Sequence, residues 1–459
     1  MVSVGQHKNI ELLSYSEVEE VSGYVGNFQV KVRKKARYVD EDLCTGCGLC
    51  EEKCPARKIP SEFNLGLGTR KAIYRPFAQA VPNTPVLDRE HCIYFQRGKC
   101  RACEKLCPRQ AIDFEQKDQI LELEAGTIVL ATGYGLFDPS GTAQFGYGLD
   151  NVLTGMEFER LISADGPTGG QVLLKDDTPP RSIAILHCIG SRDEEYHEYC
   201  SRVCCMYSLK LAHLVKEATG AEVYEVYRDM RAFGKGYEEF FNRVEREGVA
   251  FIRRGEEVGV TREDGKLLVT AEDVFSGKKI ELPVDMVVLG IGLEPHQDAG
   301  SVARIFGIGC GEVGFFTEKH PKLAPVETAS DGIFIAGACQ GPKDIPDSVA
   351  QGGAAAAAAL DMIDLGKVEL EPITSFIDEE RCSGCRICVG LCPYSAIEFV
   401  SLGGQTTSDG REVARVNEAL CKGCGTCVSA CPSGAATQRG FVDRQIYAEI
   451  EGALEFIAA

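Results

Sequence analysis

Cysteine is the residue type whose number and spacing in this sequence could do chemistry. The chain has 459 residues and 22 cysteines, and sixteen of the cysteines fall into two windows, one near each end. Each window holds two groups of four: Cys44, Cys47, Cys50 and Cys54 with Cys92, Cys100, Cys103 and Cys107, and Cys382, Cys385, Cys388 and Cys392 with Cys421, Cys424, Cys427 and Cys431. In a reducing compartment such cysteines remain thiols, and closely spaced thiolates bind metal.

Three of the four groups have the spacing C-x2-C-x2-C-x3-C with a proline directly after it, at Pro55, Pro393 and Pro432. This run is typical of bacterial ferredoxins, in which three thiolates bind one [4Fe–4S] cluster and the fourth crosses to the neighbouring cluster. The predicted ligand sets are Cys44, Cys47, Cys50 and Cys107; Cys54, Cys92, Cys100 and Cys103; Cys382, Cys385, Cys388 and Cys431; and Cys392, Cys421, Cys424 and Cys427. The long gap between Cys92 and Cys100 predicts a loop insert from Ile93 to Lys99.

Zinc is the alternative occupant, because paired C-x2-C motifs also bind tetrahedral zinc. Four quartets arranged as two ferredoxin-like pairs favour iron–sulfur clusters instead. Two two-cluster modules in one chain indicate electron transport, since a series of clusters provides a path for electrons.

Charge and hydropathy exclude other classes of protein. The 68 acidic and 49 basic side chains give a formal net charge of −19, whereas nucleic-acid binding needs clustered Lys and Arg. No apolar run approaches the roughly 20 residues that cross a bilayer, and the N-terminus lacks a signal-peptide pattern. The sequence therefore predicts a cytoplasmic protein, and one of several domains, because single cores stop growing at roughly 250–300 residues.

Between the cysteine windows, residues from about 119 to 370 alternate strand-like and helical patterns, which is typical of an α/β domain. Three apolar runs there end in small residues: Thr127-Ile-Val-Leu-Ala-Thr-Gly133, Met286-Val-Val-Leu-Gly-Ile-Gly292 and Gly332-Ile-Phe-Ile-Ala-Gly-Ala338. Each alone also fits an ordinary parallel strand. In this order they resemble the later half of the thioredoxin-reductase type of flavoprotein. The resemblance implies flavin contacts at Thr132, Gly133, Gly337, Ala338, Gln351, Gly352 and Ala355.

A second dinucleotide-type unit begins with the predicted strand Ser182-Ile-Ala-Ile-Leu186. The strand leads to His187-Cys-Ile-Gly-Ser-Arg192 in place of G-x-G-x-x-G. Without the glycine loop the backbone cannot come close to a pyrophosphate, so NAD(P)H is not expected there.

Four cysteines of this unit predict a fifth metal site: Cys188, Cys200, Cys204 and Cys205. The alternative is that they are buried packing residues, and neighbours at positions 204 and 205 cannot share one helix face. His187 and His197 are substitute ligands. Of the remaining cysteines, Cys310 is expected in the core and Cys339 close to a flavin.

The order of these parts resembles the A subunit of heterodisulfide reductase and its relatives, over essentially the whole chain. The match is carried by Tyr38-Val-Asp-Glu-Asp-Leu-Cys-Thr-Gly-Cys-Gly-Leu-Cys50, Cys92-Ile-Tyr-Phe-Gln-Arg-Gly-Lys-Cys-Arg-Ala-Cys103, Ile189-Gly-Ser-Arg192 with Cys200-Ser-Arg-Val-Cys-Cys205, and Arg231-Ala-Phe-Gly-Lys-Gly-Tyr237. It implies an α/β thioredoxin-reductase-like core with two ferredoxin-like α+β modules, one inserted and one C-terminal.

The resemblance implies seven segments. They are a partial flavoprotein segment at 1–35, the inserted module at 36–118, a flavoprotein domain at 119–180, a degenerate second dinucleotide-binding-like domain at 181–284, the flavin-contacting end at 285–370, the C-terminal module at 371–440 and a tail at 441–459. No G-x-G-x-x-G follows a strand in this chain. Either another polypeptide supplies that half of the FAD site, or FAD has been lost, or the chain is a truncated product.

The leading hypothesis is a flavin and iron–sulfur subunit of a large complex that takes part in flavin-based electron bifurcation. The resemblance implies a hydrogenase- or formate-dehydrogenase-type donor, an adaptor protein, and acceptors such as ferredoxin, a heterodisulfide with B- and C-type subunits, or an aromatic acyl-CoA reductase-type partner. Lys235 is a candidate cation near the flavin ring, with a solvated loop lysine as the alternative. No acid–base catalyst is expected. The contrasting hypothesis is a flavin-free electron-wiring scaffold.

Overall fold

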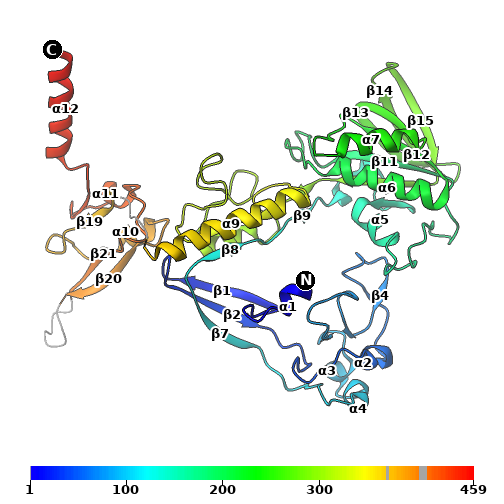
Figure 1. The fold of residues 1–459 in the computed structure, drawn as a ribbon, viewed down its shortest axis with the longest axis horizontal. Helices are drawn as coiled ribbons and strands as arrows, with labels where there is room; N and C mark the ends of the chain where they lie inside the picture. Colours follow the sequence, from blue (N-terminus) through cyan, green and yellow to red (C-terminus); the bar gives the residue numbers. More distant parts are fainter. Residues whose placement is uncertain (1, 368–371, 403–410, 459) are drawn as a thin grey trace.

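The computed structural model describes residues 2–367, 372–402 and 411–458. Figure 1 shows a large α/β unit at one end, a small inserted module below it, and a C-terminal module at the far end of the long helix α9. The short helix α1 (Val2–Gly5) begins the chain near the middle of the molecule. No helix in the described part of the chain has the length and apolarity needed to span a bilayer.

The largest element is a seven-stranded sheet with the order β10-β16-β11-β12-β13-β14-β15. Its strands are β10 (Val152–Thr154), β11 (Ser182–Ile189), β12 (Glu222–Tyr227), β13 (Ala250–Glu263), β14 (Lys266–Asp273), β15 (Lys278–Val284) and β16 (Met286–Ile291). The strands from β10 to β13 in that order are parallel, and β14 and β15 continue as an antiparallel edge. All eight residues of β11 are buried, as expected for a parallel strand covered on both faces.

This sheet extends beyond the 181–284 range expected for the second dinucleotide-type unit. It takes β10 from the preceding segment and β16 from the following one. The reason is that β11 needs a neighbour on each edge, and β16 occupies the edge opposite β12.

Three helices belong to this unit: α5 (Gly155–Leu161), α6 (Cys204–Thr219) and α7 (Tyr237–Arg246). Helix α5 begins at a capping box formed by Thr154 and Glu157, which satisfies two free N–H groups. Helix α6 packs Leu209, Leu211 and Val215 into the core on one face of the sheet. It ends at Gly220, which has a φ of 66° and closes the helix without steric strain.

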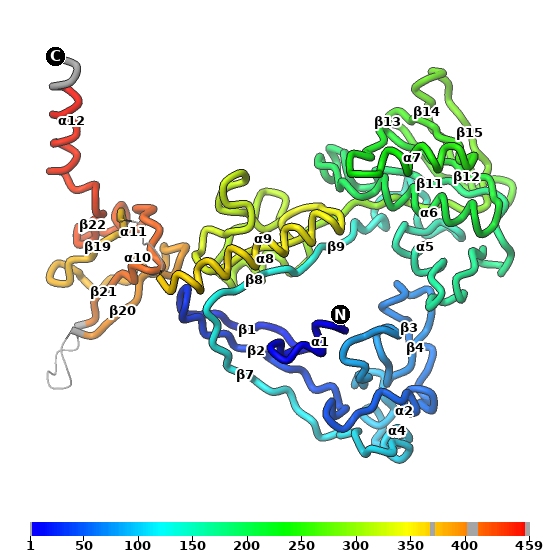
Figure 2. The backbone as a smooth tube through the Cα atoms, in the orientation of Figure 1, coloured from blue at the N-terminus to red at the C-terminus, as the bar shows by residue number. Residues whose placement is uncertain are grey.

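A three-stranded antiparallel sheet carries the inserted module. Its strands are β1 (Ser16–Ser22), β2 (Phe28–Lys34) and β7 (Gln119–Ala125). Figure 2 shows the chain leaving β2, running through the inserted module and returning along β7. The inserted module therefore has two adjacent covalent connections to the same sheet.

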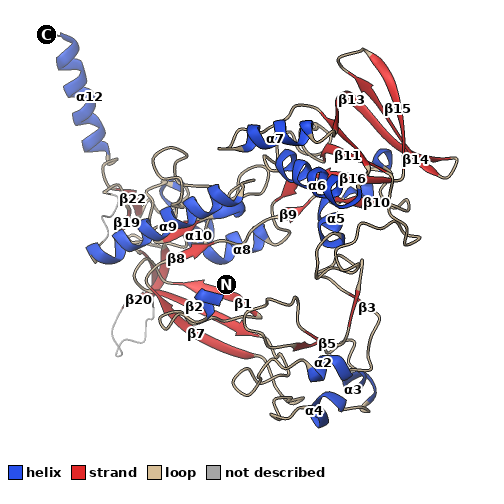
Figure 3. Cartoon of the chain, turned by 45° about the vertical axis from the view of Figure 1, so that its right-hand side comes forward, coloured by secondary structure: helices blue, strands red, loops and turns tan. Residues whose placement is uncertain are grey.

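Inside the inserted module the elements are short: α2 (Leu49–Lys53), α3 (Ile93–Arg97), α4 (Ala102–Leu106), β3 (Ile59–Pro60), β4 (Thr69–Arg70), β5 (Ile73–Tyr74) and β6 (Val86–Leu87). The C-terminal module has β19 (Ser375–Ile377), α10 (Ile387–Leu391), β20 (Ile397–Leu402), β21 (Arg411–Val416), α11 (Thr426–Ser429) and β22 (Ala436–Gln438), followed by α12 (Asp443–Ala458). Helix α12 extends away from the module in Figure 3.

The parallel pair β8 (Ile128–Leu130) and β18 (Ile333–Ile335) lies between the modules. Near it are α8 (Ala299–Phe306), the antiparallel pair β9 (Gly135–Leu136) and β17 (Leu293–Glu294), and α9 (Ile345–Leu365). Helix α9 begins at Asp344, whose carboxylate accepts the Asp347 N–H, and ends at Gly366. The runs at 127–133 and 332–338 thus form adjacent strands, whereas the run at 286–292 belongs to the large sheet.

Candidate iron–sulfur and flavin sites

Each of the four cysteine runs begins with the same turn. An Asp or Asn stands four residues before the first cysteine, at Asp40, Asp88, Asp378 and Asn417. Its side-chain oxygen accepts backbone N–H groups of the next residues, and its own N–H donates to an alanine carbonyl: Ala111, Ala72, Ala435 or Ala396. Sequence reasoning missed this fourfold repeat, although the spacing was visible. The turn directs each run toward the centre of its module.

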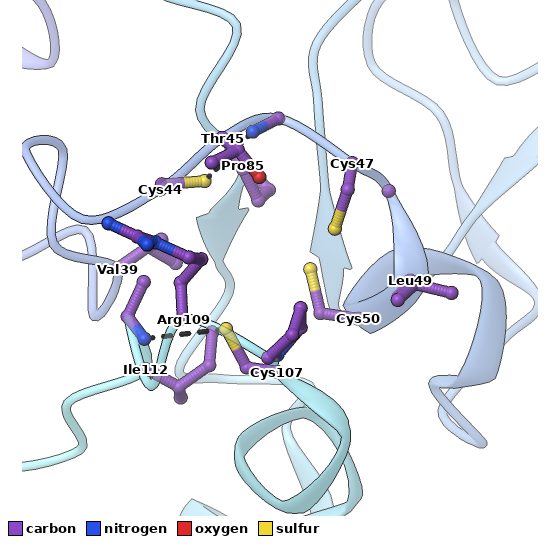
Figure 4. Close-up of a pocket in the computed structure, with 14 residues that line it drawn as sticks. Val39, Cys44, Thr45, Cys47, Leu49, Cys50, Pro85, Cys107, Arg109 and Ile112 are labelled. Atoms are coloured by element: carbon purple, nitrogen blue, oxygen red, sulfur yellow. Dashed lines mark hydrogen bonds between the residues drawn. The ribbon is translucent and has the colours of Figure 1, made fainter.

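The first set of thiols lines one pocket. Cys44, Cys47, Cys50 and Cys107 surround a cavity of about 380 Å³, with Cys107 coming from the other run (Figure 4). The backbone N–H of Gly46 donates to the Cys44 sulfur at 3.4 Å. These are the four cysteines that the crossing rule assigns to one cluster.

The second pocket lies across the same module. Cys54, Cys92, Cys100 and Cys103 surround about 340 Å³, together with Tyr94 and Phe114. The insert predicted from Ile93 to Lys99 forms helix α3, so the extra residues are ordered and add aromatic rings to the wall of this pocket.

The C-terminal module repeats the arrangement. One pocket of about 330 Å³ is lined by Cys382, Cys385, Cys388 and Cys431, and another of about 310 Å³ by Cys392, Cys421, Cys424 and Cys427. In all four pockets the structure brings together one crossing set of thiols. The four sulfurs around a cubane each bond a different iron atom, so this open ring of thiols fits a [4Fe–4S] cluster.

The thiols differ in their surroundings. Burial raises the pKa of Cys50 to about 11 and that of Cys103 to about 12. Burial also raises the pKa of Cys427, while the Ser375 hydroxyl, whose oxygen lies 3.3 Å from the Cys427 sulfur, opposes the rise. Ligation by iron therefore has to displace protons from these thiols, which couples cluster binding to proton release.

The Cys188 group lies at the carboxyl end of the large sheet. Cys188 is in β11 with a φ of 61°, Cys200 is in the following loop, and Cys204 and Cys205 open α6. The pKa of Cys204 is raised by burial and then by Cys188, Cys205 and Cys200, so the four thiols are close neighbours. The adjacent pair diverges: the Cys204 sulfur lies 3.5 Å from the Ile291 carbonyl oxygen, and the Cys205 sulfur 3.7 Å from that of Asp229.

A buried ionisable pair stands beside this group. His187 and Glu225 are fully buried, and the imidazole Nε2 pairs with the Glu225 carboxylate. Burial by itself would lower the pKa of His187, but Glu225 and Cys205 raise it. His197, the other substitute ligand, is committed to Glu294, with 2.7 Å between Nε2 and Oε1.

The candidate flavin contacts gather where β8 and β18 meet α9. Gly133 and Gly337 have φ values of 77° and 79°, which only glycine adopts freely. The Gly337 N–H donates to the Gln351 side chain at 2.7 Å, which ties the strand end to the helix. A side chain at Gly133 or Gly352 would meet open space, so a ligand can approach the backbone there.

The other predicted contacts in this region have different surroundings. Ala355 is fully buried and packs in a cluster with Phe334 and Ala336, so its side chain faces protein. The backbone N–H of Thr132 lies against the buried Cys339 sulfur. Ala338 belongs to the short 3-10 turn Gly337–Cys339.

Comparison with known proteins identifies the chain's family. The 4Fe-4S binding domain family matches residues 37–57, and the 4Fe-4S dicluster domain family matches residues 381–435. The chain is 49% identical to the iron-sulfur A subunit of the CoB–CoM heterodisulfide reductase of Methanocaldococcus jannaschii, over 99% of this chain and 68% of that protein. The chain belongs to the family of heterodisulfide reductase A subunits.

Further relatives agree. One of the two such iron-sulfur A subunits of Methanopyrus kandleri is 52% identical over 99% of this chain and 68% of its own length. The A subunit of the H(2):CoB-CoM heterodisulfide,ferredoxin reductase of Methanothermobacter marburgensis is 49% identical over 99% and 67%. Among solved structures, T. acidophilum thioredoxin reductase covers 64% of this chain and 85% of its own, with 13% identity and a TM-score of 0.36. The chain is an oxidoreductase subunit of mixed α/β fold with 4Fe–4S modules at both ends.

Sequence reasoning missed two basic residues near the predicted flavin contacts of this family member. Arg202 bonds Asp347 on α9, with 2.7 Å between Nη2 and Oδ2, and lies over the Phe233 ring. Lys343 is half-buried, and burial and Arg202 lower its pKa. In the sequence, the only indication of these two residues was their position: Arg202 lies within a group of cysteines, and Lys343 lies just before the start of a helix. Lys235, the predicted flavin cation, is an exposed loop residue.

One cysteine prediction is wrong. Cys310 is exposed, because its backbone forms only an isolated bridge with Phe316, whose side chain is buried, and Cys310 itself is in no apolar strand. Within residues 2–367, 372–402 and 411–458, no three or more His, Cys, Asp or Glu side chains converge on the position of a single metal ion, whereas the thiol rings of the four pockets are spaced more widely, as a cubane cluster requires.

Proposed function

We propose that this chain is the iron–sulfur and flavin electron-transfer subunit of a cytoplasmic heterodisulfide reductase-type complex. The observation that carries the proposal is the set of four thiol-lined pockets, in two pairs, each built from one crossing set of cysteines. Paired pockets within one module allow an electron to pass between neighbouring clusters. The sixteen cysteines of these pockets are the proposed ligands.

A fifth cluster is proposed at Cys188, Cys200, Cys204 and Cys205. The mutual effect of these thiols on the pKa of Cys204 supports it, as does the Arg202 N–H that donates to the Cys200 sulfur at 3.4 Å. The same Arg202 bonds Asp347 on α9. The group is therefore linked through one side chain to the helix that lies against the proposed flavin site.

FAD is proposed at the edge formed by β8, β18 and α9, with Thr132, Gly133, Gly337, Ala338, Gln351, Gly352 and Ala355 lining or supporting the site. Bound flavin would exchange electron pairs on one side and single electrons on the other. Gln351 holds Gly337 in place, and the glycines leave room for the ligand. Lys343 supplies positive charge next to Cys339, and Arg202 lies beside Lys343. Lys235 lies in an exposed loop and remains a candidate cation for the flavin ring only from that loop.

A complementary polypeptide segment is proposed to cover this site. Parallel sheets are normally buried on both faces, yet Val129 of β8 is 45% exposed. Helix α9 presents Ile345, Val349, Leu360 and Ile363 to the surface, all more than half exposed. A strand–G-x-G-x-x-G–helix unit, which would hold the ADP half of FAD, would cover this apolar surface.

Within the complex, we propose flavin-based bifurcation between a hydrogenase- or formate-dehydrogenase-type donor, reached through an adaptor protein, and two classes of acceptor. The low-potential acceptor would be ferredoxin or an aromatic acyl-CoA reductase-type partner. The high-potential acceptor would be a heterodisulfide on B- and C-type subunits. The two modules, at opposite ends of the chain, support two separate exits (Figure 1).

Metal, sulfide and flavin analysis of the anaerobically purified chain, alone and in its complex, tests the proposal. Five clusters predict about twenty irons per chain, and four predict about sixteen. Flavin in the complex supports the branch-point role, and its absence from both preparations favours the flavin-free wiring scaffold. Zinc in place of iron would contradict both.

A further inference from the structure

The inserted module carries a concentrated positive patch in an acidic protein. Helices α3 and α4 and their flanks contain six exposed basic side chains, here called the basic patch: Arg89, Arg97, Lys99, Arg101, Lys105 and Arg109. The same stretch has two acidic residues, Glu90 and Glu104, whereas the whole chain has a net charge of −19. Among the described residues, only Arg101 of the patch has an ion-pair partner, Glu104. The other five basic side chains are therefore available to pair with acidic groups of another molecule.

The patch surrounds an exposed thiol of the second pocket. Cys100 lines that pocket and is itself exposed, and both its sequence neighbours, Lys99 and Arg101, are exposed and basic. Figures 1 and 3 place α3 and α4 at the outer edge of the molecule, away from the other domains. A partner protein can therefore approach this pocket at Cys100, where the route to the solvent is shortest.

The insert predicted from the cysteine spacing builds the platform for this patch. It contributes Tyr94 and Phe95, which pack with Phe114. The Arg89 guanidinium lies over Phe95 and that of Arg101 over both Tyr94 and Phe114, each 5.3 Å from the ring centroid. Such contacts hold the charges at the surface in a defined position, which lowers the entropy cost of recognition.

We propose that the basic patch is the docking surface for an acidic one-electron carrier protein of the ferredoxin class. Positive charge around the exit attracts such a carrier and orients its cluster toward Cys100. One electron is exchanged: the cluster at Cys54, Cys92, Cys100 and Cys103 loses it and the oxidised carrier gains it, with no proton or bond change. An extended polyanion fits less well, because the surrounding chain is acidic.

The inference rests on the proposed electron-transfer function, so binding and electron exchange are measured separately. The probe is an oxidised, acidic two-cluster ferredoxin, and the protein is the full chain with its clusters. The test variant is Arg97→Glu with Lys99→Glu. The control is Lys278→Glu with Lys279→Glu in β15, which makes the same charge change at exposed positions outside both iron–sulfur modules.

The test variant is expected to weaken ferredoxin binding by about tenfold or more, while the control stays within about twofold of the parent chain. Binding of the parent should weaken steeply with salt. The rate of electron exchange with ferredoxin should fall in parallel, while excess dithionite should still reduce the clusters to the same extent. Iron content and the visible spectrum confirm that the variant is loaded. If it loses iron, Arg97→Gln with Lys99→Gln replaces it.

Equal binding by both variants, or binding that salt does not weaken, would overturn the docking surface. Binding to an oligonucleotide or to phosphatidylglycerol vesicles that the test variant alone abolishes, with no binding to ferredoxin, would assign the patch to another partner and also overturn it. Failure of the parent chain to hold iron is a different outcome, since it removes the proposed function itself.

Discussion

The two iron–sulfur modules share one ligand arrangement but differ in what surrounds it. In the inserted module the second pocket is walled by aromatic rings, and most basic residues of the adjoining patch lack an ion-pair partner among the described residues. In the C-terminal module three exposed arginines are neutralised by the Arg386–Glu412, Arg415–Glu379 and Arg439–Glu418 ion pairs. The cysteine run therefore builds the cage, and the residues outside the run set its surroundings, on which the potential of a bound cluster depends.

The modules also differ in how they are attached. The inserted module has two connections to the β1–β2–β7 sheet, reinforced by the Ala36 N–H that donates to Asp118 at 2.8 Å. The C-terminal module follows α9 and is fixed by the ion pair between Lys422 and Asp331, both largely buried. One module is held by its chain topology and the other by a side-chain contact.

Removal of iron should have the largest effect, and both modules should lose ordered structure. Their cores contain cysteines, such as Cys103 in one and Cys427 in the other, so the empty cages lose their cross-links. Hydrogen exchange should rise throughout residues 36–118 and in the described part of 372–440, while β11 and β16 stay protected. Protection that persists in either module without iron would contradict this.

Breaking the Lys422–Asp331 ion pair should affect the C-terminal module and leave the inserted module unchanged. Lys422→Met leaves the Asp331 carboxylate without this partner and should cost about 2 kcal/mol of docking free energy. Protease cleavage at the described residues that flank the pair, 328–332 and 420–424, should become faster, while the inserted module is unaffected. Arg386→Met, which removes an exposed pair, is the matched control and should change cleavage little. Equal cleavage rates in the two variants would show that the ion pair does not anchor the module.

Two turns of the inserted module should respond differently to the same substitution. Asp40→Asn keeps a side-chain oxygen for the turn and should cost no more than about 0.5 kcal/mol, since Asn417 has this role in the C-terminal module. Asp88→Asn also loses the Arg70 pair, 2.9 Å between Nη2 and Oδ2, and should cost about 1–2 kcal/mol. Local unfolding free energies from hydrogen exchange check the difference, and identical costs would argue against the pair.

The smallest expected effect is on a reduction potential. The Cys427 thiol donates to the Ser375 hydroxyl oxygen, and once Cys427 is a thiolate ligand that hydroxyl would donate to its sulfur instead. Ser375→Ala should therefore lower the potential of the cluster at Cys392, Cys421, Cys424 and Cys427, because hydrogen bonds to sulfur stabilise the reduced state. A change on the order of tens of millivolts is expected, within the span of about −700 to +450 mV known for such clusters. Redox titration followed by electron paramagnetic resonance measures it. The other cluster of the module is the internal control, and a shift of both would point to a general structural change.

The sequence alone predicted much of the fold and of the candidate metal sites of this protein. Cysteine spacing predicted which thiols gather in each pocket, because short runs impose a local turn and leave the fourth cysteine to cross. It also located the insert before Cys100 and the α/β core. The family resemblance came from the same motifs, and the relatives confirm it.

Other features depended on contacts between distant segments, which spacing does not encode. The sheet took β10 and β16 from outside the expected range, since strand neighbours are chosen by packing. Cys310 is exposed although cysteine is usually buried. The pairing of Arg202 with Asp347 joins residues 145 positions apart. Ligand spacing is a local property of the chain, whereas attachment, surface charge and access arise only when remote side chains meet.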